Sequence, residues 1–187
     1  YPSGVIDKST AGYGNLSSTW TEPSYRLTGS YKFNDDMFLY GTVSRGYKAG
    51  GINIDARISP PADPLTYGTE QLWNYEAGFR GHALDHRLTG EITAFYLDRA
   101  DTQVRDSAGF GGNYRFFTAN GDTARVSGLE AAATWVLARA WSVQASGFLQ
   151  DSDLAPFRLA SGLPAGGRRL ANTPRHGHTV ALRHGAG

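Results

Sequence analysis

The sequence contains no cysteine among its 187 residues, which excludes a disulfide-stapled fold, a cysteine-ligated zinc site and thiol chemistry. It also lacks any apolar run of the roughly 18 residues that a transmembrane helix needs, and its most apolar stretch, residues 131–138, is interrupted by Thr134. The first residues contain no methionine, basic segment or apolar segment, so we expect no signal peptide. We expect that a leader was removed or that the chain begins inside a longer protein.

Net charge is almost absent, because 18 basic side chains face 17 acidic ones and leave a formal charge of +1. Such a chain has no net positive electrostatic field that would attract nucleic acid, and we expect no nucleic-acid partner. Glycine is abundant, at 24 residues, but shows no collagen-like period. The length predicts about one domain, residues 1–187.

The dominant sequence period is two. In residues 24–33, 72–81, 128–137 and 141–150, one face is apolar at 17 of 20 positions and the other at 4 of 20, counting glycine as non-apolar. Alternation of this kind predicts β-strands with one buried or lipid-facing side. Residues 37–46 and 88–97 alternate less cleanly, because Phe38, Tyr40, Phe95 and Leu97 fall on the polar side. With a last strand through residues 179–182, we expect about seven strands and no helix.

The connections alternate strictly between short and long. The short ones are residues 34–36, 82–86 and 138–140, and the long, polar, Gly/Pro-rich ones are roughly residues 48–70, 100–125 and 154–174. Every long loop therefore emerges at one end of the predicted sheet and every short turn at the other.

This asymmetry favours a membrane barrel over a soluble β-sandwich, although apolar and polar residues alternate along the strands of both. Soluble strands average about 5–6 residues, whereas transmembrane strands need about 9–11, with short turns on one side, long loops on the other and aromatic rings at both interfaces. Here the predicted strands reach ten residues, and aromatic residues lie near both ends: Phe33, Tyr40, Trp135 and Trp141 near the short turns, and Trp20, Tyr47, Trp73, Tyr75 and Tyr96 near the long loops.

Five motifs in order resemble the barrels of TonB-dependent outer-membrane receptors, particularly those for siderophores and other iron complexes. They cover the chain from about Tyr25 to its end. They are residues 31–53 (YKFNDDMFLYGTVSRGYKAGGIN), 70–80 (EQLWNYEAGFR), 88–99 with AFY at 94–96, 119–130 (ANGDTARVSGLE) and 174–176 (PRH).

The resemblance implies an all-β, antiparallel, up-and-down transmembrane β-barrel segment, about seven strands of a barrel of about 22. The family's plug domain, TonB box and final aromatic strand have no counterpart in this sequence. We therefore expect a partial barrel domain from the C-terminal half of a receptor, which by itself neither spans a membrane nor transports.

By the same resemblance, the intact receptor lies in a Gram-negative outer membrane among its lipids and takes up a ferric siderophore or similar nutrient. TonB–ExbB–ExbD would act only through the absent plug and TonB box. The resemblance implies no cofactor and no enzymatic activity. Two alternatives remain open: a passive porin-like barrel, and a secreted soluble β-sandwich that binds carbohydrate through exposed Trp and Tyr.

The segment that follows the second predicted strand holds the candidate ligand contacts Tyr47, Lys48 and Asn53. The paired Gly50 and Gly51 free the backbone where the strand turns into a loop. An aromatic face and a cation suit an anionic ferric chelate, although a plain strand exit with interfacial Tyr and snorkelling Lys is the favoured interpretation.

For the remaining histidine, glutamate, glycine and aspartate clusters, we predict no catalytic, metal-binding or phosphate-binding role. His176 with His178, and His82 with His86, lack a third ligand, and no metal site is predicted. Glu76, Glu91 and Glu130 are expected to pair with arginines such as Arg26 and Arg80. A loop glycine run (GFGG, residues 109–112) has no phosphate-binding lysine, and the aspartates near the long loops lack calcium-loop spacing: Asp98, Asp101, Asp106, Asp151 and Asp153.

Overall fold

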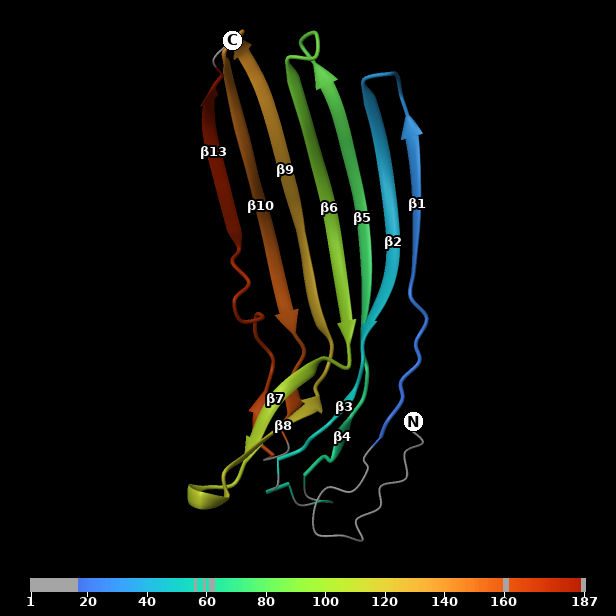
Figure 1. Cartoon of the computed structure of the whole chain (residues 1–187), viewed down its shortest axis with the longest axis vertical. Helices are drawn as coiled ribbons and strands as arrows, with labels where there is room; N and C mark the ends of the chain where they lie inside the picture. Colours follow the sequence, from blue (N-terminus) through green and yellow to red (C-terminus); the bar gives the residue numbers. More distant parts are fainter. Residues whose placement is uncertain (1–16, 56, 59, 61–62, 160–161, 186–187) are drawn as a thin grey trace.

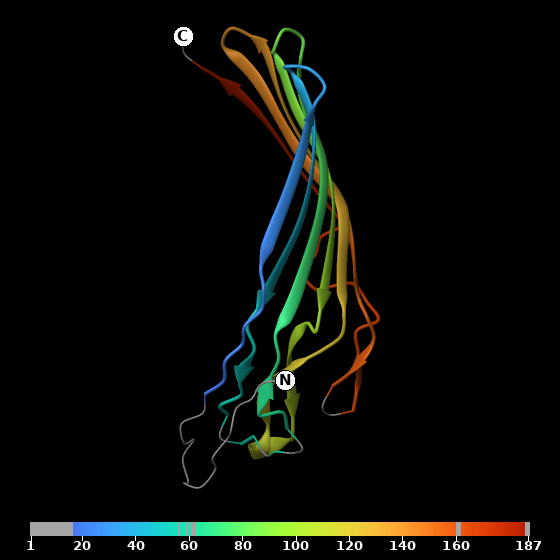
Figure 2. The same ribbon diagram turned by 90° about the vertical axis from the view of Figure 1, so that its right-hand side faces the viewer.

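A computed structural model describes residues 17–55, 57–58, 60, 63–159 and 162–185. Its main element is one seven-stranded antiparallel sheet whose strands are neighbours in chain order. The strands are β1 (Tyr25–Lys32), β2 (Met37–Lys48), β5 (Glu70–Ala83), β6 (Leu88–Ala100), β9 (Ala124–Ala138), β10 (Trp141–Leu154) and β13 (His176–His184). Figure 1 shows them side by side, and Figure 2 shows that the sheet is curved. The predicted up-and-down arrangement is confirmed, and the sheet stays open, with β1 and β13 at its edges.

The strands extend beyond their predicted ends at the long-loop side. β9 has 15 residues and β5 and β10 have 14 each, against the ten that alternation indicated. Charged residues break the apolar pattern there, but the pairing continues, as between Asp98 and Arg125. Their side chains form a salt bridge of 3.5 Å. The strands therefore stay paired beyond the end of the apolar face.

Short turns and long connections lie at opposite ends of the sheet, as predicted (Figure 1). In the first short turn, the Asn34 side chain accepts a hydrogen bond from the Asp36 backbone N–H at 2.9 Å. Each long connection folds in part into a small hairpin. These hairpins pair β3 (Gly51–Ile52) with β4 (Thr66–Tyr67), β7 (Gln103–Ala108) with β8 (Arg115–Asn120), and β11 (Phe157–Arg158) with β12 (Pro164–Ala165). A single 3₁₀ turn, η1 (Gly111–Asn113), caps the β7–β8 hairpin.

Strand register aligns the apolar positions of all strands on one face of the sheet. One row runs from Leu39 through Phe79, Ile92 and Ala131 to Gly147. This face is uncovered: Leu27 is 74% exposed and Val180 69% exposed. Every other sheet in the described part of the chain has only two strands, so no second sheet packs on it. The β-sandwich alternative, which needs two sheets packed face to face, is therefore wrong.

Aromatic rings gather at both ends of this apolar face. At the loop end, Trp73 meets Tyr25 edge-on at 5.6 Å and stacks with Tyr75 at 6.0 Å. At the turn end, Phe33 lies 5.2 Å from Tyr31. Within the described residues, no helix has the length and apolarity needed to cross a bilayer.

The aromatic residues on the polar face have a packing role that the sequence pattern does not show. Three of them lie over a glycine on the neighbouring strand, in the pairs Tyr40–Gly78, Phe95–Gly128 and Phe148–Gly177. A Cβ added at Gly128 would lie 2.8 Å from the Phe95 ring, and one added at Gly78 would clash with the Tyr40 ring. Covering a strand glycine with a cross-strand ring stabilises a position that has no side chain of its own. Glycine–aromatic pairs thus account for Tyr40 in β2 and Phe95 in β6, whereas Phe38 lies 5.9 Å from the Arg80 guanidinium.

Candidate functional site

The polar face of the sheet carries a ladder of side-chain hydrogen bonds. The Tyr40 and Thr93 hydroxyls lie 2.7 Å apart, and the Asn74 amide donates to Glu76 at 2.6 Å. Arg80 Nε donates to Glu91 at 2.8 Å, which confirms the predicted pairing of Glu91 with an arginine. Glu76 takes its hydrogen bond from an amide instead, and the described residues contain no salt bridge from Glu130 or Arg26.

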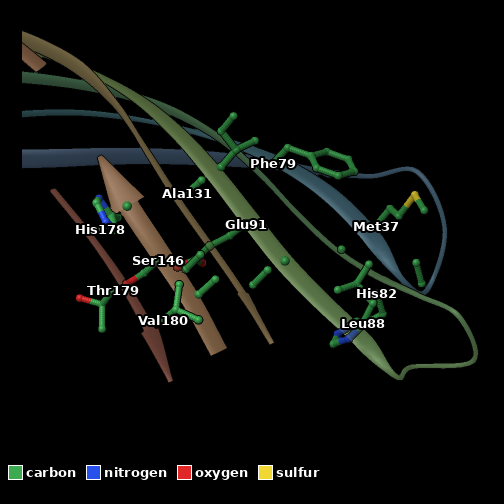
Figure 3. Close-up of a pocket in the computed structure, with 18 residues that line it drawn as sticks. Met37, Phe79, His82, Leu88, Glu91, Ala131, Ser146, His178, Thr179 and Val180 are labelled. Atoms are coloured by element: carbon green, nitrogen blue, oxygen red, sulfur yellow. The ribbon is translucent and has the colours of Figure 1, made fainter. Parts of the chain in front are cut away.

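The opposite, apolar face is hollowed near the turn end into a groove of about 560 Å³. Its floor consists of small residues, such as Ala131 and Gly147, and Figure 3 shows Phe79 and Met37 on one flank and Val180 on the other. The groove is part of the exposed apolar surface, and the small side chains of its floor carry no catalytic or metal-binding group.

The three candidate ligand contacts do not converge. Alternation along β2 places Tyr47 on the face of Leu39 and Val43, and Lys48 on the opposite, polar face. Tyr47 is 38% exposed, and Lys48 is also exposed. Their role as ligand contacts stays a prediction, but one ligand on one face would not reach both.

Asn53, the third candidate, is only 7% exposed and joins two hairpins. Its amide donates to the Pro64 carbonyl at 2.9 Å and to the Thr118 carbonyl at 2.8 Å, and its side-chain oxygen accepts from the Thr118 N–H at 2.8 Å. The β3–β4 hairpin is thereby fastened to β8. A ligand bound by Asn53 would have to displace these hydrogen bonds.

A second junction lies where both hairpins leave the sheet. Asn120 accepts from the Gly68 N–H at 2.6 Å and donates to the Asp101 carbonyl at 2.9 Å. Glu70, 6% exposed, accepts from Arg99 Nε at 2.8 Å and from the Gln103 N–H at 2.7 Å. Two of the motifs that carry the family resemblance, residues 31–53 and 119–130, therefore contribute the asparagines that bind the hairpins together.

The glycine pair before Asn53 is required by close packing. A Cβ added at Gly50 would lie 2.5 Å from the Trp20 indole, and one added at Gly51 would clash with the Tyr67 ring. The pair lets two aromatic rings rest on bare backbone at the base of the β3–β4 hairpin.

Two ion pairs secure the outer part of this hairpin. Arg115 of β8 donates to the Asp63 carboxylate at 2.6 Å, and Asp63 is only 3% exposed. Arg57 donates to both Asp55 carboxylate oxygens, at 2.9 and 2.7 Å. Hydrogen bonds from Arg57 hold the pKa of the Asp55 carboxyl well below its usual range, and the Asp63 carboxylate raises the pKa of Arg115. Both pairs are therefore charged at neutral pH.

Between the two hairpins lies a cleft of about 550 Å³ that the sequence did not predict. Its lining combines Arg57, Arg105, Tyr67 and Phe116. The Arg105 guanidinium lies 5.1 Å from the centre of the Phe116 ring, and this ring is 45% exposed. The cleft thus presents cations and aromatic surface to solvent at the long-loop end of the sheet.

The histidine and aspartate clusters show no metal-binding geometry. His82 and His86 lie 5.4 Å apart, ring centre to ring centre, and Asp151 pairs with Arg169 at 2.7 Å. Across the described ranges, no group of three or more His, Asp or Glu side chains could hold a metal ion.

The Asn53 junction gives a first prediction. Asn53→Ala leaves the Thr118 N–H and C=O without their partner, at a cost of about 1–3 kcal/mol per buried unsatisfied group. We expect residues 48–70 to be cleaved several-fold faster when a protease is added to the complete, folded protein that contains this chain. Thr118→Ala is the control, because Thr118 contributes only backbone atoms to the junction. Equal cleavage rates in the two variants would contradict the role of Asn53.

Comparison with known proteins agrees with this geometry. A family model described as "TonB dependent receptor-like, beta-barrel" matches residues 4–186. The pesticin receptor of Yersinia pestis is 30% identical over 159 residues, which cover 81% of this chain and 21% of the receptor. The pesticin receptor of Yersinia enterocolitica is 29% identical over the same coverage.

Solved structures give the same fold. The ferric yersiniabactin uptake receptor from Yersinia pestis is 27% identical, with a TM-score of 0.65 over 85% of this chain and 22% of that one. The siderophore receptor PiuA from Acinetobacter baumannii, 18% identical, has a TM-score of 0.63 over 86% of this chain and 23% of that one, and shows the fold alone. This chain spans about a fifth of the length of the relatives it matches.

Proposed function

Because the chain belongs to the TonB-dependent receptor β-barrel family, we propose that it forms part of the wall and outer loops of an outer-membrane receptor for a ferric siderophore. In this proposal the wall and loops bind and admit the chelate, and energy supplied through TonB acts on the plug domain of the receptor. The chain contributes no catalytic step.

The single observation that carries the proposal is the division of the sheet into two faces. Large apolar side chains stay uncovered across all seven strands, while the other face carries hydrogen-bonded polar side chains and the Arg80–Glu91 pair. A water-exposed sheet would leave the apolar face unfavourably hydrated, at roughly 25 cal/mol for each Å². A barrel wall satisfies both faces, because one meets lipid and the other meets the aqueous lumen.

The edges of the sheet support a larger barrel. Within the part of the chain that the structure describes, β1 and β13 each pair on one side only, and unpaired backbone groups in lipid cost several kcal/mol each. Further strands of the receptor would pair with these edges.

The relatives support a ferric siderophore as the cargo. The ferric yersiniabactin uptake receptor is 27% identical to this chain, which makes ferric yersiniabactin the first ligand to test. We propose a ferric chelate of this class as the transported substrate.

The test is uptake by the complete receptor in its host. Deleting the gene that contains this chain should abolish growth on ferric yersiniabactin, or on one member of a siderophore panel, when iron is limiting. Removing TonB should abolish the same growth. A passive porin-like barrel predicts uptake that is independent of TonB, and that result would overturn the proposal.

A further inference from the structure

We propose that the cleft between the β3–β4 and β7–β8 hairpins binds an anionic oxygen of the transported chelate, of the carboxylate or phenolate type, through Arg105 and Phe116. This inference rests on the proposed function and assigns a recognition site within it. It places the site in the loops, away from Tyr47 and Lys48.

The cleft is preformed. Asn53 joins β3–β4 to the backbone of Thr118, and Arg115 joins β8 to Asp63. These partners are separated by 65 and 52 positions along the chain, so the two hairpins behave as one unit. A ligand entering such a cleft loses little affinity to the ordering of loops.

The charges in the cleft do not cancel. Arg57 and Asp55 both line the cleft and are paired with each other through two hydrogen bonds. Arg105 also lies in the cleft, and within the described residues its guanidinium forms no salt bridge with a carboxylate. The balance of these three charged lining residues is one positive charge, carried by Arg105.

The geometry of Arg105 suits an oxygen anion. Its guanidinium lies over the Phe116 ring at 5.1 Å, and Tyr114 packs edge-on against the same ring at 5.1 Å. Stacking on a ring holds a guanidinium plane in place and leaves its N–H groups directed outward. Those N–H groups form a planar fork that matches a carboxylate or a pair of phenolate oxygens.

Aromatic surface completes the site. Phe116 is 45% exposed, and Tyr67 also lines the cleft. Exposed rings beside a cation suit a chelate whose anionic oxygens are attached to planar, apolar groups. A simple inorganic anion would use the charge but not the rings.

The experiment measures ligand binding to the complete purified receptor by quenching of its tryptophan fluorescence. The probes are ferric yersiniabactin, an anionic ferric tris-catecholate and the neutral ferric tris-acetohydroxamate. Arg105→Gln should weaken binding of the anionic probes about tenfold or more, because it removes a charge-assisted hydrogen bond. Arg105→Lys should recover only part of that loss, because lysine lacks the planar fork. Phe116→Leu should weaken binding several-fold.

The matched control is Arg139→Gln, which makes the same charge change in the short turn at the far end of the sheet. It should leave all affinities unchanged. The site is disproved if the wild-type receptor binds an anionic probe and Arg105→Gln binds it equally well. An equal loss for the neutral probe would also overturn it, because that result indicates a disturbed fold. A wild-type receptor that binds no ferric probe contradicts the proposed function instead.

Discussion

Replacing Ala131 by arginine is expected to destabilise the complete receptor in lipid vesicles by about 2–4 kcal/mol, the cost of a cation at the middle of a barrel's lipid-facing surface. Ala131 lies in the middle of β9, in register with Ile92 on one side and Gly147 on the other. All three positions belong to the apolar face. An arginine there would meet hydrocarbon, with no carboxylate from its own strand to pair with it.

The neighbouring alanine provides the control. Ala132 is the same residue type one position further along β9 and therefore points to the opposite, polar face. Ala132→Arg places the cation beside Glu91, its register partner, and should cost less than about 1 kcal/mol. Denaturant unfolding of both variants in phospholipid vesicles measures the difference. If the two arginines were equally costly, the apolar face would not be the lipid-facing one.

Replacing Gly128 by alanine is the second large effect that we expect, with a loss of about 1–3 kcal/mol from forced overpacking. A Cβ at Gly128 would clash with the Leu149 carbonyl oxygen and lie 2.8 Å from the Phe95 ring. The ring could rotate away, but the carbonyl belongs to the β9–β10 ladder. The strand pair would have to separate locally, and unfolding in denaturant should begin at a lower concentration.

Gly46→Ala is the matched control for this substitution. Gly46 also lies inside a strand, β2, but a Cβ there meets nothing within 4 Å. Alanine should be neutral or slightly stabilising at that position, by up to about 1 kcal/mol, because glycine is the more flexible residue in the unfolded chain. A similar loss in both variants would mean that glycine is needed for backbone conformation rather than for the close approach of Phe95 and Leu149.

The sheet was predictable because its physical constraint is periodic. A strand that separates an apolar medium from a polar one must alternate, so β5, β9 and β10 are visible in the sequence. Alternation fails where another interaction takes over. Phe95 and Tyr40 fall on the polar face because a glycine lies opposite each of them, and only the strand register reveals that pairing.

The candidate site was predicted less well, because loop side chains follow no period. Tyr47 and Lys48 are adjacent in sequence, and the regular continuation of β2 sends them to opposite faces. Asn53 looked like a ligand contact because it ends a motif rich in glycine and aromatic residues. In the structure its side chain is occupied by the backbone of Thr118, 65 positions away.

The sequence by itself determined the number of long strands, the face that each presents and the end at which each connection emerges. These properties follow from local alternation and from the lengths of the segments between strands. Only the tertiary structure decided that two of the long connections interlock and that Arg105, Phe116 and Arg57 share one cleft. Such groupings depend on hydrogen bonds and ion pairs between residues far apart in the chain, and no short-range pattern records them.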